Sequence, residues 1–129
     1  MRVIWLVLVA FLTLGSSSFA GDAGLERMLR RLDLETRFEQ LCAIEAMRRI
    51  DQAKNSFHPD RADVGAISEP VADAQLMKGS GGAFRSGGHW YRFTFSCRAS
   101  ADRLKVLDFK YTIGAKIPED EWENYGLWK

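Results

Sequence analysis

Residues 89–98 read HWYRFTFSCR, and the alternation within this stretch decides the fold. Large apolar side chains and a cysteine recur at every second position, and most of the positions between them are polar. A period of two is typical of a β-strand whose two faces meet different surroundings. The face predicted to meet the core consists of Tyr91, Phe93, Phe95 and Cys97, and the other face consists of Trp90, Arg92, Thr94 and Ser96.

The residues on both sides of this strand predict two antiparallel neighbours. The SGG sequence at 86–88 is a turn signal that joins the strand to a preceding one at 83–85. Downstream, a polar turn at 100–103 leads into LKVLDFKYTIG, a second alternating stretch. Its predicted inner face consists of Leu107, Phe109, Tyr111 and Ile113.

A long amphipathic helix precedes the strands. Asp33 is a typical N-cap residue, and the sequence after it, LETRFEQLCAIEAMRRIDQA, carries apolar residues three and four positions apart as far as Ala53. A shorter helical pattern covers 25–32. The stripe of the long helix consists of Leu34, Phe38, Leu41, Cys42, Ala46 and Ile50. Together these patterns predict an α+β fold in which N-terminal helices pack on a small antiparallel sheet.

The remaining segments are less regular. We expect a short strand at 64–67, and either a helical turn or a strand at 71–77. The glycines of GSGGAF, at 79–84, predict a flexible loop. Near the end of the chain, Pro118 begins a short helix with acidic residues in its first turn, and Gly126 ends it.

The first twenty residues have the features of a secretory signal peptide. Arg2 precedes the apolar run 3–14, and small residues lead to a cleavage site after Ala20. An uncleaved anchor is the alternative, but the run is shorter than the roughly 20 residues that span a membrane. We therefore expect one domain at 21–129, without a membrane span, in the periplasm or outside the cell.

Charge and cysteine content restrict the class of protein further. Loss of the signal removes one basic residue, Arg2, and leaves basic and acidic residues equal in number. This balance argues against nucleic-acid binding, which favours a basic surface. The two cysteines, Cys42 and Cys97, are far apart, so an exported chain favours a structural disulfide over a redox pair. Both lie on predicted core faces, where a bridge would join the helix to the sheet.

Three blocks of the sequence resemble the bacterial exported domains classified as domain of unknown function 930. They read TRFEQLCAIEAMRRI, GGAFRSGGHWYRFTFSC and LDFKYTIGAKIPEDEWENYGLW. The resemblance extends from about Asp33 to Trp128. It implies an envelope or secreted location and pairing of Cys42 with Cys97, but it implies no activity, ligand or catalytic residue.

The triplet His58-Pro59-Asp60 also occurs in J-domain co-chaperones, where it lies between two antiparallel helices. Here the following residues, RADVGAISEP, predict a strand or an irregular segment that stops at Pro70. A motif without its structural context carries no function. We therefore expect the triplet to be a loop that leaves the long helix.

The polar residues give no complete catalytic or metal-binding pattern. His58 and His89, with Asp60 and Asp63 as helpers, fall short of a spacing that chelates a metal, so we predict no metal and no cofactor. No nucleophile stands beside an oriented base in a known motif, so we predict no catalytic residue. A small hydrolase that uses His58, Asp60 or His89 is retained as an alternative.

Aromatic and arginine residues gather on the second face of the strand and in the C-terminal segment. Such residues are enriched in binding hot spots. The candidate binding residues are Arg85, Trp90, Arg92 and Trp122. The competing interpretation is that the C-terminal helix folds over this face, so that Trp90 and Trp122 form a second small core.

The favoured function is a non-catalytic binding module for an envelope protein or a cell-wall ligand such as a glycan. A third interpretation is an inhibitor that presents the glycine loop 78–88 to a partner enzyme. The sequence leaves the oligomeric state open.

Overall fold

The structure, a computed structural model, describes residues 18–129, with side chains from residue 23 onward. Two helices come first, α1 (Ser18–Arg30) and α2 (Leu34–Gln52). The strands are β1 (Pro59–Asp63), β2 (Val71–Asp73), β3 (Leu76–Ser86), β4 (His89–Ala99) and β5 (Val106–Lys116). A 3-10 helix, η1 (Glu119–Tyr125), follows them. The predicted signal peptide lies outside the described residues except for its last three, which begin α1, and its cleavage stays a prediction.

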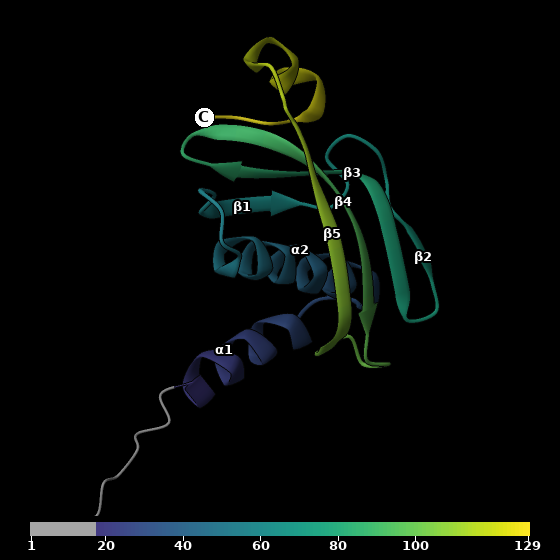
Figure 1. Cartoon of the computed structure of the whole chain (residues 1–129). Helices are drawn as coiled ribbons and strands as arrows, with labels where there is room; N and C mark the ends of the chain where they lie inside the picture. Colours follow the sequence, from purple (N-terminus) through teal and green to yellow (C-terminus); the bar gives the residue numbers. More distant parts are fainter. Residues whose placement is uncertain (1–17) are drawn as a thin grey trace, which may run out of the picture.

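The strands form one antiparallel sheet in the order β1-β3-β4-β5, and β2 also pairs with β3. β1 and β2 share the same edge of β3, because β1 pairs with its second half and β2 with its first. α2 runs beside β1 along the inner face of the curved sheet, and η1 lies at the far end of β5 (Figure 1). The prediction of N-terminal helices on a small antiparallel sheet is confirmed.

α2 begins and packs largely as its sequence predicts. The Asp33 carboxylate accepts a hydrogen bond from the Thr36 backbone N–H at 2.9 Å, which satisfies one of the free donors of the first turn. The apolar stripe is buried against the sheet with one exception, Leu34, which is 49% exposed. Leu34 lies in the first turn of the helix and lines a shallow groove beside β2 instead of the core.

The predicted bridge between Cys42 of α2 and Cys97 of β4 is confirmed. The two Cα atoms are 6.1 Å apart, and both side chains are buried in the main core with Phe93 and Phe95. The bridge therefore fastens the helix to the middle of the sheet. Disulfides persist in oxidising compartments, so this one indicates a protein that folds outside the reducing cytosol.

The glycine-rich segment at 79–84 is part of strand β3, so the predicted flexible loop is wrong. Gly79 and Gly82 lie opposite Phe95 and Phe93, whose rings cover the β3 backbone. A Cβ atom at Gly79 would lie 2.4 Å from the Phe95 ring. These glycines are therefore needed because they let aromatic rings pack closely on a strand. Residues 78–86 form a strand, so they do not form the loop that an inhibitor would present.

Two further expectations need correction, and one open alternative is decided. The strand predicted at 64–67 is an irregular segment, because pairing of β1 with β3 ends at Asp63. The undecided segment 71–77 forms β2 and the start of β3. Leu107 is 60% exposed, because a register irregularity between Arg98 and Ala99 breaks the alternation at the start of β5.

A second, smaller core covers Trp90 on the other face of β4. It consists of Ala83, Trp90, Ile117, Trp122 and Leu127. The Trp122 indole N–H donates to the Ile117 carbonyl at 3.0 Å, and the Ile117 backbone N–H donates to the Trp90 carbonyl at 2.8 Å. Gly126 takes a left-handed conformation (φ 66°) that turns the chain back, so that Leu127 reaches this core.

We predict that the disulfide supplies a large share of the stability. Replacement of both Cys42 and Cys97 by Ser should lower the free energy of unfolding by about 4 kcal/mol, because the bridge closes a long loop in the unfolded chain. Urea denaturation of the oxidised protein and of the double variant measures the difference. Equal midpoints for the two proteins would contradict this role of the bridge.

We predict a comparable loss from truncation of Trp90. The side chain is 1% exposed, so Trp90→Ala should cost roughly 3–5 kcal/mol, whereas Leu107→Ala on the exposed start of β5 should cost less than about 1 kcal/mol. Thermal and urea unfolding of both variants measure these costs. A Trp90→Ala protein as stable as the Leu107→Ala control would show that the second core contributes little.

Candidate functional site

The structure separates the four candidate binding residues into buried and surface groups. Trp90 and Trp122 are buried together in the second core, which confirms the interpretation that the C-terminal helix folds over this face of the strand. Arg92 lies 5.7 Å from the centre of the Tyr125 ring, on which it stacks. Arg85 is the one of the four that reaches an exposed aromatic ring.

That exposed ring belongs to Trp128, which is 54% exposed. The Trp90 indole N–H donates to the Trp128 carbonyl oxygen at 2.7 Å, and the two rings meet edge to face with centres 5.6 Å apart. Trp128 follows Leu127, whose side chain points into the second core. A buried tryptophan thus holds the backbone of an exposed one.

Arg85 supports the Trp128 ring from β3. Its guanidinium carbon lies 5.9 Å from the centre of the Trp90 ring and 6.0 Å from that of Trp128. Two of its N–H groups donate to the Asp60 carboxylate at 2.9 and 2.8 Å. These hydrogen bonds keep the pKa of Asp60 below its usual value. The ion pair with Asp60 thus holds Arg85 within cation–π distance of both indoles.

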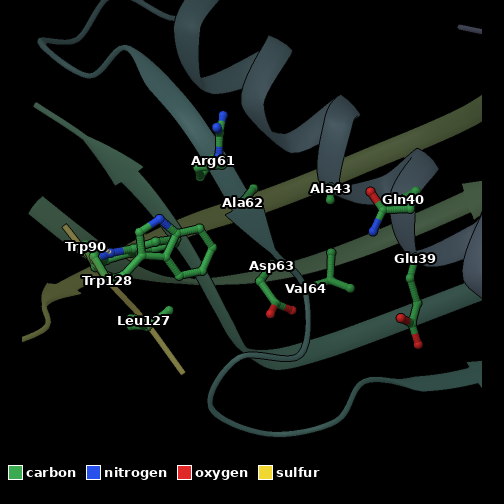
Figure 2. A pocket seen from close by; sticks show the side chains of 10 residues that line it. All are labelled: Glu39, Gln40, Ala43, Arg61, Ala62, Asp63, Val64, Trp90, Leu127 and Trp128. Carbon is green, nitrogen blue, oxygen red and sulfur yellow. Dashed lines mark hydrogen bonds between the residues drawn. The ribbon is translucent and has the colours of Figure 1, made fainter. Parts of the chain in front are cut away.

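Trp128 stands at one end of a cavity of about 260 Å³ between α2, β1 and the C-terminal segment (Figure 2). Figure 2 shows both indoles at one end, Glu39 and Gln40 at the other, and Asp63 between them. The apolar lining comes from Ala43, Ala62, Val64, Trp90, Leu127 and Trp128, and the polar lining comes from Glu39, Gln40, Arg61 and Asp63. The cavity therefore combines one large exposed ring with polar groups that can orient a ligand.

The polar end of the cavity is negative. Burial raises the pKa of the Glu39 carboxyl, and four neighbouring carboxylates raise it further. These are Glu69, Glu35, Asp63 and Asp33. The Arg61 guanidinium donates to the Asp60 backbone carbonyl at 2.7 Å. Acidic charge therefore outweighs basic charge around the polar lining.

The sequence patterns missed most of these cavity residues. Glu39 lies between the apolar positions of a helical pattern, and Arg61 and Asp63 lie in a segment that predicts a strand or an irregular structure. They meet only because α2 packs beside β1. The C-terminal cluster of aromatics was the one signal in the sequence that pointed to this place.

The residues of the hydrolase alternative do not line the cavity and are not brought together. His58 Nδ1 lies 2.9 Å from an Asp51 carboxylate oxygen on an exposed surface, and Asp60 is held by Arg85. His89 is exposed at the start of β4. Pro59 and Asp60 are the first residues of strand β1, so the loop expected for the triplet is confirmed only at His58. The triplet does not connect two helices, which separates it from a J-domain.

The other described parts of the chain contain weaker candidates for a functional site. Among the side chains that the structure describes, from residue 23 to 129, no group of three or more His, Cys, Asp or Glu is placed to hold a metal. No helix in this range is long and apolar enough to cross a membrane. Two larger grooves lie between the helices and the start of β5, and between α2 and β2, but neither is lined by an exposed aromatic side chain.

Comparison with known proteins identifies the family of the chain. No curated protein and no solved structure matches it. The model of one family, described as Domain of Unknown Function (DUF930), matches residues 29–127. The matched range includes α2, all five strands, η1 and both cysteines. The chain therefore belongs to the DUF930 family.

Proposed function

We propose that this protein is a non-catalytic binding module of the periplasm or the extracellular space, which takes an envelope ligand in the cavity beside Trp128. The observation that carries the proposal is a half-exposed tryptophan fixed by a buried tryptophan and a paired arginine. A rigid aromatic ring offers much contact area, and little conformational freedom is lost when a ligand covers it.

The location rests on two supports. The Cys42–Cys97 bridge favours an oxidising compartment. The predicted signal peptide at the start of the chain favours export through a membrane. A ligand of such a protein would belong to the cell envelope or its surroundings, either a protein or a part of the cell wall.

The alternatives receive no specific support from the geometry. A hydrolase would need its base beside a ligand cavity, whereas His58 and Asp51 form an exposed pair elsewhere on the surface. An inhibitor would need a presented loop, whereas the residues in question form β3. The binding module is therefore the function that we favour.

We predict that a photo-reactive amino acid in place of Gln40 captures a specific envelope component. Gln40 is exposed and lines the cavity, so the reactive group would face a bound ligand. Capture should saturate, and Trp128→Ala should weaken it by at least about 2 kcal/mol in apparent affinity, as expected for a hot spot. Mass spectrometry and glycan staining of the adducts identify the class of component.

Two features make this experiment selective. Trp128→Ala keeps the backbone carbonyl that accepts the Trp90 hydrogen bond, so it removes the ring while the second core stays closed. The same reactive group in place of Leu107, which is exposed on β5, is the matched control. Identical adducts from both positions, or none from Gln40, would exclude a ligand site at the cavity.

A further inference from the structure

The side chains that line this cavity restrict the chemical class of ligand that it can bind. The exposed face of Trp128 is flat and apolar, and an indole face carries partial negative charge. A ligand that stacks on it needs a flat patch of C–H groups with slight positive charge. The C–H groups on one face of a sugar ring have this property, as do those of other saturated rings.

A cationic ligand fits the aromatic end poorly. Such ligands are held by the electron-rich faces of aromatic rings. Here the guanidinium of Arg85 lies about 6 Å from the centres of the Trp90 and Trp128 rings. The attraction of these rings for a cation is therefore already directed at Arg85. A second cation at the Trp128 ring would be repelled by Arg85, although Asp60 reduces that repulsion.

An anionic ligand fits the polar end poorly. Glu39 and Asp63 both line the cavity, and the pKa of Glu39 is raised first by its burial and then by the carboxylates around it. A phosphate or a carboxylate group placed there would add to this repulsion. An anion is disfavoured at the polar end and a cation is disfavoured on the Trp128 ring, so we expect the group that stacks on Trp128 to be uncharged.

The polar side chains suit a ligand with neighbouring hydroxyl groups. Glu39, Gln40, Arg61 and Asp63 each end in a planar group with at least two polar atoms, and together they offer donors and acceptors. Such groups can bind two adjacent hydroxyls at once. The volume of about 260 Å³ lies below the range typical of pockets for drug-sized ligands, which fits a single ring.

From the exposed aromatic face, the charges, the polar side chains and the volume of the cavity, we infer that the ligand is an uncharged sugar ring of a glycan. The ring stacks on Trp128, and Asp63 and Glu39 form hydrogen bonds with its hydroxyls. This inference rests on the proposed function, because it assigns a ligand class to the same cavity. It requires no covalent step.

The test is a titration of the oxidised protein with trisaccharides. Tryptophan fluorescence and calorimetry measure the binding. The neutral probes are cellotriose, maltotriose and N-acetylchitotriose, the anionic probe is trigalacturonate, and the cationic probe is the deacetylated chitosan trimer. We expect saturable binding of at least one neutral probe and no binding of the two charged probes.

Variants connect the binding to the cavity. Trp128→Ala should weaken binding of the neutral probe at least about thirty-fold, because it removes the stacking surface. Asp63→Asn and Glu39→Gln should each weaken it roughly tenfold, because a charged acceptor is lost. The matched controls are Leu107→Ala for the exposed apolar residue and Asp108→Asn for an exposed carboxylate of β5, and both should bind as the unaltered protein does.

The outcomes separate this inference from the proposed function. Binding of a charged probe in preference to the neutral ones would overturn the inference, and so would equal binding by Trp128→Ala and Leu107→Ala. If no trisaccharide binds although the reactive group at Gln40 captures an envelope protein, the ligand class is wrong and the binding module stands. If that group captures nothing, the proposed function fails as well.

Discussion

β4 buries a row of side chains on one face and the single large side chain of Trp90 on the other, and the rest of the structure is arranged to cover them. Phe93, Phe95 and Cys97 face α2, whereas Trp90 faces the C-terminal segment. Each of these two groups of apolar side chains needs its own cover against water. This constraint explains why an N-terminal helix and a C-terminal turn, far apart in the chain, belong to one domain (Figure 1).

The cavity lies where these two covers approach each other. α2 supplies Glu39 and Gln40, the C-terminal segment supplies Leu127 and Trp128, and β1 lies between them. The residue that fills the second core, Trp90, also donates the hydrogen bond that holds Trp128 in place. Stability of the second core and geometry of the candidate site are therefore linked through one side chain.

Much of the fold follows from local patterns. The alternation of β4, the Asp33 cap and the helical stripe each depend on residues a few positions apart, and the structure confirms them. The pairing of Cys42 with Cys97 followed because both lay on predicted core faces.

Features that depend on contacts between residues far apart in the sequence could not be predicted from local patterns. Glycines at 79–82 give a loop signal locally, yet their role is set by Phe93 and Phe95 of the next strand. The covering of Trp90 could be foreseen only as one of two alternatives. The polar side of the cavity combines residues of α2 and β1 that share no spacing in the sequence, so no local pattern marks it.

The central claim is that the C-terminal segment covers Trp90 and thereby fixes Trp128 at the surface. Amide and indole hydrogen exchange by nuclear magnetic resonance tests it most directly, because each indole N–H gives its own signal. The account predicts slow exchange for Trp90 and Trp122, whose N–H groups donate to backbone carbonyls, and fast exchange for Trp128. Fast exchange at Trp90 would mean that its face of the sheet is open to water, and would contradict the account.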